Sequence, residues 1–186
     1  MRRRVALGLS LAAALSLATP AGARILMSQQ QALSLAFPPG TDVQRETFFL
    51  DAAQLAAAKR LAGEELHQEL VVRYAGRRGG RVVGYAYFDA HRVRTLTETL
   101  MFVLSPDGRI ERVELLSFLE PEDYLPRRRW LDQLDGRALD QELSLNRAIR
   151  PLSGASLTSQ AVVKASRRVL ALHQVLGGPP GGAISR

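Results

Sequence analysis

Small and hydroxyl-bearing residues crowd one short stretch near the C-terminal end of the chain. Residues 151–159 read Pro-Leu-Ser-Gly-Ala-Ser-Leu-Thr-Ser and lead into a periodic apolar segment that is typical of a helix. The free N–H groups of a first helical turn favour an anion, and Gly154 and Ala155 allow close approach to the backbone. The hydroxyls of this stretch add donors at Ser153, Ser156, Thr158 and Ser159. The pattern indicates a phosphate site, although Ser and Thr before a helix are also common N-caps.

The helix that follows is predicted over residues 159–176. Its apolar residues step by three and four and form one stripe, at Val162, Ala165, Val169, Leu172 and Leu176. The polar side is expected to carry Lys164, Arg167, Arg168 and Gln174. Residues 177–180, Gly-Gly-Pro-Pro, end the helix. This arrangement would hold the hydroxyl-rich stretch at the N-terminal end of a long helix.

The middle of the chain is expected to be a β-meander. Strands are predicted over residues 69–74, 81–89, 97–104 and 109–118, with turns at 76–80 and 105–108. The second turn, Ser-Pro-Asp-Gly, supplies a fixed φ and a left-handed position. The sequence therefore predicts an α+β fold, with an antiparallel meander of about four strands and flanking helices.

Shorter elements are expected around this sheet. Helices are predicted over 28–36 and 52–62, the second capped by Asp51 and closed by Gly63. Residues 42–50 are expected to be extended, residues 127–134 to form a short helix, and residues 119–126 and 138–150 to be connections.

The N-terminus has the pattern of a secretory signal peptide. Arg2 to Arg4 form a basic region, Val5 to Ala18 a short apolar region, and Ala21-Gly22-Ala23 a cleavage site. We expect residues 1–23 to be removed, residues 24–63 to be a helical segment packed on the domain, residues 64–177 to be the functional domain, and residues 178–186 to be a flexible tail. No transmembrane span is expected after cleavage, which places the protein in the periplasm.

Composition narrows the class of partner. Loss of residues 1–23 removes three arginines and no acid, so the formal charge falls from +7 to +4. This small excess, in an exported protein, argues against nucleic acid as a partner. The chain has no cysteine, which excludes disulfides and thiolate ligands. Its three histidines, His67, His91 and His173, show no metal-ligand spacing, so no metal is expected.

The segment at residues 153–158 resembles the flavinylation motif of FMN-binding domain proteins, which include the exported flavoprotein subunits of the Rnf complex and of the sodium-translocating NADH:quinone oxidoreductase. The family pattern is Asp-x-x-Ser/Thr-Gly-Ala-Ser/Thr-x-Ser/Thr, and an exported flavin transferase esterifies FMN phosphate to its last hydroxyl. Here the core reads Ser-Gly-Ala-Ser-Leu-Thr. The resemblance implies Thr158 as covalent FMN acceptor, with Ser153, Gly154, Ala155, Ser156 and Leu157 around the phosphate.

The resemblance extends over residues 81–176, with one departure. The family's Asp falls at position 150, where this chain has Arg150. An arginine there leaves two interpretations open, a covalent ester or noncovalent FMN held by a charge-assisted contact. The acidic, proline-containing loop at Glu120-Pro121, with Tyr124 after it, stands where the family places a loop near the flavin. The resemblance thus implies Glu120 and Tyr124 as further cofactor-binding residues.

Other residues have two interpretations each. Tyr124 and Trp130 can stack on a flavin ring or anchor the fold. Arg92 and Arg94, beside His91, can pair with phosphate or with Glu98, or be solvated charges. His173 is expected to complement the C-terminal dipole of its helix. The run Arg127–Arg129 is expected to be a solvated face, with a docking patch for an acidic partner as the alternative.

The predicted function is that of a periplasmic FMN-binding electron-transfer protein, because a flavin supplies redox chemistry that side chains lack. Its expected partners are a flavin transferase for attachment and a membrane or periplasmic redox protein. The alternative is a flavin-free interaction module on the same scaffold. A stand-alone enzyme has no Ser/His/Asp or paired-carboxylate arrangement to support it, so a redox carrier is favoured over an enzyme with its own substrate.

Overall fold

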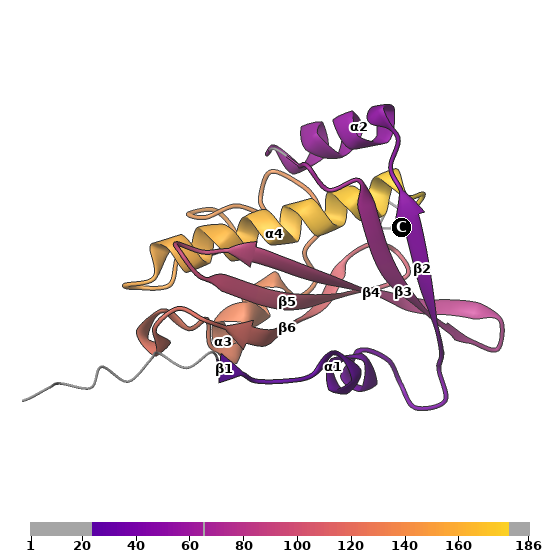
Figure 1. The fold of residues 1–186 in the computed structure, drawn as a ribbon, viewed down its shortest axis with the longest axis horizontal. Helices are drawn as coiled ribbons and strands as arrows, with labels where there is room; N and C mark the ends of the chain where they lie inside the picture. Colours follow the sequence, from indigo (N-terminus) through magenta and orange to yellow (C-terminus); the bar gives the residue numbers. More distant parts are fainter. Residues whose placement is uncertain (1–23, 65, 179–186) are drawn as a thin grey trace, which may run out of the picture.

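The computed structural model describes residues 24–64 and 66–178, so the predicted signal peptide and residues 179–186 of the predicted tail lie outside the described residues. Its centre is an antiparallel sheet of six strands in the order β1-β6-β5-β4-β3-β2 (Figure 1). The strands are β1 (Arg24–Ile25), β2 (Asp42–Phe49), β3 (Leu70–Arg78), β4 (Arg81–Arg92), β5 (Thr97–Leu104) and β6 (Ile110–Phe118).

Helices flank this sheet. They are α1 (Gln29–Ala36), α2 (Ala52–Ala62), α3 (Arg128–Leu131) and α4 (Ser156–Val175), with 3₁₀ turns η1 (Glu122–Tyr124) and η2 (Asp132–Leu134). The predicted α+β class, the antiparallel meander and the long C-terminal helix are confirmed. The strand count is six rather than about four, because residues 24–63 also contribute β1 and β2 to the sheet.

Local capping explains where the N-terminal helices begin and end. The Asp51 carboxylate accepts the backbone N–H of Gln54 at 2.7 Å, and the Gln54 side chain returns a bond to the Asp51 N–H. Gly63 ends α2 at φ 75° and donates its N–H to the Lys59 carbonyl. The same reciprocal box, built by Ser28 and Gln31, starts α1. These bounds were predicted correctly because such caps depend on near neighbours alone.

The first hairpin is longer than predicted. β3 runs to Arg78 instead of stopping at Tyr74, and only Gly79 and Gly80, both at positive φ, make the turn. A register shift between Gly76 and Arg77 absorbs the irregularity, so the strand continues through residues that were assigned to the turn. β4 likewise continues beyond Asp89 to Arg92, which places His91 in the sheet rather than in a connection.

The two faces of the sheet are covered unequally. α4 lies along one face, with α2 packed on it, and α1 lies below the opposite face (Figure 1). In β5, Leu100, Phe102 and Leu104 point to the α4 side and belong to the main core. Met101 and Val103 point to the α1 side and belong to a smaller cluster. α4 therefore faces the larger core, and the candidate site lies at its N-terminal end.

Gly76 is expected to tolerate no side chain. A Cβ at this position would lie 2.5 Å from Cδ1 of Phe37, a buried ring of the smaller cluster. We expect Gly76→Ala to lower the free energy of unfolding by about 1–3 kcal/mol through overpacking. Urea denaturation measures this loss, and the double variant Gly76→Ala/Phe37→Leu should lose less than the sum of the two single changes. Additive losses would show that Phe37 is not what the new methyl group meets.

Candidate functional site

A small hollow lies at the N-terminal end of α4, with about 210 Å³ of empty space including the part open to solvent. It joins three segments that are far apart in the sequence. Its lining residues are Val93, Arg94, Glu120, Tyr124, Ala155, Leu157 and Thr158. The hollow thus brings the predicted cofactor-binding residues Glu120 and Tyr124 together with the predicted acceptor Thr158.

α4 begins three residues earlier than predicted, at Ser156, so the hydroxyl-rich stretch enters the helix itself. Ala155 is the N-cap, with φ −129° and ψ 48°, and no side chain caps the helix there. The N–H groups of Ser156, Leu157 and Thr158 belong to the first turn, which leaves them without an intrahelical acceptor. Thr158 is therefore not the N-cap that the alternative interpretation required.

The remaining motif residues differ in exposure and role. Gly154 has φ +77°, the left-handed region that favours glycine, and Ser153 and Ser156 are exposed. The Ser159 hydroxyl accepts the Leu152 N–H at 2.8 Å and donates to the Ala155 carbonyl at 3.1 Å. Ser159 therefore fixes the turn before α4 and faces the protein interior.

Thr158 is 1 % exposed, and its side chain borders the hollow. Leu157, beside it, is 42 % exposed and covers the outer rim. The Thr158 side chain is thus buried from the open surface and borders only the hollow.

Glu120 shapes the opposite wall. Its Oε1 accepts the backbone N–H groups of Arg94, Thr95 and Leu96 at 3.2, 2.9 and 2.9 Å. The hydrogen bonds from Leu96 and Thr95 are the main reason that the pKa of Glu120 lies below its usual value. Glu120 is therefore an ionised carboxylate that holds the turn after β4 in place.

Arg94 contributes the cation of this site. Its guanidinium carbon lies 5.1 Å from the centroid of the Tyr124 ring, a cation–π contact that positions both side chains at the hollow. Arg92 and Arg94 are both exposed, but Arg92 is not among the residues that line the hollow. Of the interpretations considered for these arginines, the structure places Arg94 at the hollow with Tyr124, and neither arginine pairs with Glu98.

Trp130 does not reach the hollow. It is 8 % exposed, belongs to the main core, and donates its indole N–H to the Arg150 carbonyl at 2.8 Å. The interpretation of Trp130 as a stacking ring is therefore wrong, and the fold-anchoring one is right. The Arg150 N–H donates to Gln133 Oε1 at 3.0 Å, and the Arg150 side chain is exposed.

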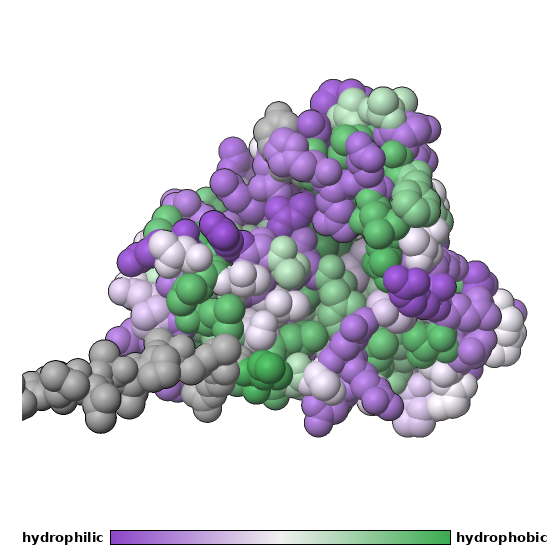
Figure 2. Space-filling model, in the orientation of Figure 1, coloured by the Kyte–Doolittle hydropathy of each residue, from purple (hydrophilic) through white to green (hydrophobic). Residues whose placement is uncertain are grey.

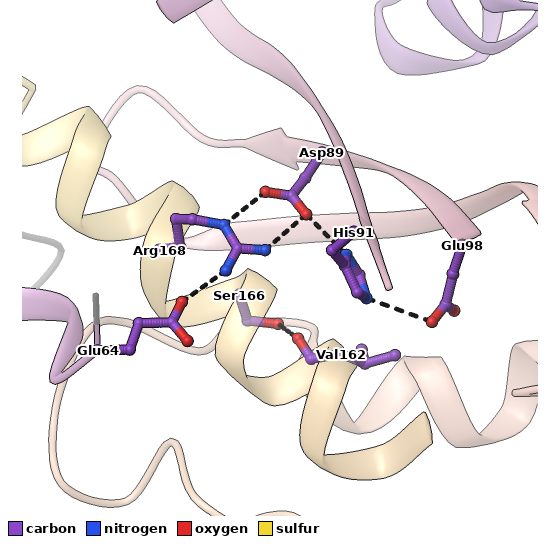
Figure 3. A network of polar contacts seen from close by, with 7 residues as sticks. All are labelled: Glu64, Asp89, His91, Glu98, Val162, Ser166 and Arg168. Carbon is purple, nitrogen blue, oxygen red and sulfur yellow. Dashed lines mark hydrogen bonds and ion pairs between the residues drawn. The ribbon is translucent and has the colours of Figure 1, made fainter. Parts of the chain in front are cut away.

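A second polar group of residues is buried between the sheet and α4 (Figure 3). Arg168 of α4 binds Asp89 of β4 through two hydrogen bonds of 2.8 Å and binds Glu64 at 2.6 Å. His91 Nδ1 lies 2.8 Å from Asp89 Oδ1, and His91 Nε2 lies 3.4 Å from Glu98 Oε2. The five side chains form a continuous chain of charges from Glu64 to Glu98.

Burial and pairing determine the pKa values of His91, Asp89 and Glu98 in this network of charges. Burial alone lowers the pKa of His91, but Asp89 and Glu98 outweigh it and raise that pKa to about 9. Burial raises the pKa of Asp89, but the bonds from His91 and Arg168 prevail and lower it. Burial dominates at Glu98, whose pKa is raised. His91 is thus protonated at neutral pH, and Glu98 binds a proton more readily than an ordinary glutamate does.

Sequence reasoning missed this group of residues. Arg168 was predicted on the solvated side of its helix, but it points inward to Asp89. The available signal was the alternation along β4, where Tyr85, Tyr87, Asp89 and His91 share one face with the core. Charges at two buried positions of a strand require a buried partner.

His173 contradicts its prediction as well. It is fully buried, with Nδ1 2.9 Å from the hydroxyl of Tyr87. Burial, with the charge of Arg73, lowers the pKa of His173 to about 4. It is uncharged at neutral pH and cannot complement the helix dipole as a cation. His173 instead packs the C-terminal end of α4 on the sheet.

Hydrophobic and hydrophilic residues are intermixed on the face shown in Figure 2. In the predicted run of solvated arginines, Arg127 and Arg129 are exposed, and Arg128 forms ion pairs with Glu114 and Asp132 at 2.9 and 2.7 Å. Such exposed pairs contribute little to stability.

Within residues 24–64 and 66–178, no helix has the length and apolar character needed to span a bilayer. The same residues contain no group of three or more His, Asp or Glu side chains that could hold a metal ion. Comparison of the chain with protein-family models, with curated proteins and with solved structures found no match.

Proposed function

We propose that this protein is an exported FMN-binding electron carrier, and that FMN phosphate is esterified to the Thr158 hydroxyl at the N-terminus of α4. The observation that carries the proposal is the hollow itself, in which Thr158 and Ala155 meet Glu120, Tyr124 and Arg94. The segments that carry Thr158, Ala155, Glu120 and Tyr124 are the ones that the resemblance to FMN-binding domains implies on sequence alone, and Arg94 is added by the fold.

The chemistry of the first turn of α4 suits a phosphate. Three N–H groups, of Ser156, Leu157 and Thr158, have no intrahelical acceptor, and the helix dipole favours negative charge at this end. The absence of a side-chain cap leaves these donors available to a ligand. Arg94 brings a positive charge to the opposite wall, where it offsets part of the charge of Glu120.

The flavin would supply the electron transfer, and the chain would supply binding and orientation. Tyr124 offers an aromatic face at the hollow, and Glu120 keeps the loop beside it in position. A covalent link suits the periplasm, where a dissociated cofactor is hard to replace. The proposed partners are a flavin transferase and a membrane or periplasmic redox protein.

Thr158→Val is expected to abolish covalent FMN, because valine keeps the shape of the side chain but lacks the hydroxyl. The experiment co-expresses the exported protein with a flavin transferase, then measures intact mass and the flavin fluorescence of the denatured band. The wild type should gain the mass of FMN minus water, and the variant should gain none. Thr47→Val is the matched control, since it makes the same change at an exposed threonine of β2 that does not line the hollow, and it should keep the full gain.

Two other outcomes distinguish the alternatives. A yellow protein that loses its colour on denaturation would mean noncovalent FMN. In that case Arg150→Asp, which restores the family's acidic residue, should produce the covalent product. A colourless protein in both forms would contradict the proposal and favour a flavin-free interaction module.

A further inference from the structure

We propose that the buried pair Glu98–His91 takes up a proton from water when electrons arrive at the neighbouring hollow, so that the redox state there and the protonation of Glu98 are coupled. This inference rests on the proposed function, because it assumes that the hollow binds FMN. It assigns a role to the one buried carboxylate that the fold leaves without a hydrogen bond in the described part of the chain.

The pair is close in sequence to residues that line the hollow. Val93, which lines the hollow, follows His91 by two residues, or about 7 Å along an extended chain. Thr158, on the other wall, precedes Val162 by four residues, about 6 Å of rise along the helix. Val162 lies on the side of α4 that faces His91 and Glu98 (Figure 3). The pair and the hollow are therefore built from neighbouring residues of the same elements, and a charge placed in the hollow acts on the pair through buried protein, where screening is weak.

Glu98 has the features of a proton-binding group. It is 0 % exposed, and neither carboxylate oxygen has a hydrogen-bond partner among the described residues. Its nearest charged neighbour is His91 Nε2 at 3.4 Å, and that nitrogen also lacks a hydrogen bond of good geometry. An ionised carboxylate is costly in such a site unless it is paired, so protonation of Glu98 requires little free energy.

The other charged groups that face the pair are fixed. Asp89 on β4 accepts two bonds from Arg168 on α4, and Arg168 also binds Glu64, which follows α2. Their short bonds favour the ionised forms, and the pKa of Asp89 is lowered while that of Arg168 is raised. Glu98 and His91 are therefore the two groups of this cluster whose protonation state changes.

Electrons and protons are both accounted for in this coupling. A flavin bound in the hollow would supply the acceptor for two electrons from a reduced partner protein, together with one or two protons of its own. The negative charge gained in the hollow makes the neighbouring pair bind a further proton from water, and no covalent bond to the chain forms or breaks. Because linkage is reciprocal, a protonated pair raises the reduction potential at the hollow, and its deprotonation lowers it.

The test compares wild-type holoprotein with Glu98→Gln, using dithionite as reductant and measuring the midpoint potential as a function of pH. The potential of the wild type should fall more steeply with pH than that of Glu98→Gln. Glu46→Gln is the matched control, because it makes the same change at an ion pair with Arg73 on β2 and β3. It should keep the wild-type slope.

A second readout follows the His91 ring directly by NMR in apoprotein, oxidised holoprotein and reduced holoprotein. Its titration should move to higher pH on reduction, and Glu98→Gln should remove most of that shift. His91→Gln should likewise weaken the dependence of the midpoint potential on pH. This variant provides the test if Glu98→Gln folds poorly.

The possible failures are distinguishable. A wild type that binds no FMN overturns both this inference and the proposed function. A yellow protein whose potential has the same pH dependence in the wild type, Glu98→Gln and His91→Gln overturns this inference alone.

Discussion

Arg168→Met is expected to lower the free energy of unfolding by about 3–5 kcal/mol, the range for removing one partner of a buried ion pair. Arg168 is the common counter-charge of Asp89 and Glu64, whose side chains are 8 % and 16 % exposed. Methionine fills a similar volume but leaves both carboxylates without a positive charge beside them. The loss should appear in urea denaturation as a lower midpoint with an unchanged slope.

The matched control for this change is Arg147→Met. Arg147 pairs with Glu142 at 3.2 Å, but both side chains are more than half exposed. We expect that variant to lose less than about 0.5 kcal/mol. The stability loss of Arg168→Lys should lie between the losses of these two variants, because lysine keeps the charge but cannot form both hydrogen bonds with Asp89. Equal losses for Arg168→Met and Arg147→Met would contradict the assignment of a buried network.

The free energy of unfolding is expected to fall by about 2–3 kcal/mol as pH rises from about 6.5 to 9. In the fold, Asp89 and Glu98 overcome the effect of burial and raise the pKa of His91 to about 9, against 6.5 for an ordinary histidine. The folded protein thus retains the His91 proton over a range in which the unfolded chain has released it. Stabilisation by protonated His91 is complete below pH 6.5 and is lost as pH approaches 9.

This pH range is well suited to the measurement. The chain has no cysteine to titrate there. His173, with its pKa lowered to about 4 by burial and by Arg73, is uncharged in the fold throughout this range. In the unfolded chain it has the ordinary pKa of about 6.5 and loses its proton mainly at the lower end of the range. Urea denaturation at several pH values measures how the free energy of unfolding changes with pH, and His91→Gln should remove most of this change. A wild-type profile that is flat between pH 6.5 and 9 would show that His91 has no raised pKa.

Much of the fold could be predicted because its signals are local. The Asp51 and Gly63 caps, the turn at residues 105–108 and the period of α4 each depend on residues close in sequence. β2 was expected to be extended, but its place in the sheet depends on pairing with β3, which no local pattern encodes. The first hairpin was misjudged because its glycines suggested a wide turn, while a bulge at Gly76 keeps the strand going.

The candidate site also has residues that local sequence could predict and residues that depend on the fold. The motif residues from Ser153 to Thr158 are contiguous, so the sequence could point to them before their surroundings were known. Glu120 and Tyr124 required the family resemblance to be connected with the motif. Arg168, Asp89 and Glu98 could not be grouped, because a charge among apolar neighbours gives no indication of which distant charge it meets. Their separation, 79 residues between Arg168 and Asp89, is a property of the fold.

The position of α4 at the end of the described chain has a consequence for how the fold is reached. The partners of the buried polar groups on β4 are supplied by α4, at sequence separations of 79 residues for Asp89 and 86 for Tyr87. The meander can pair its strands early, but until α4 docks, Asp89 and His91 remain charges on an open sheet face. Contacts this distant slow folding and make it cooperative. The buried charge pairs and the hollow are therefore completed only when α4 docks on the sheet.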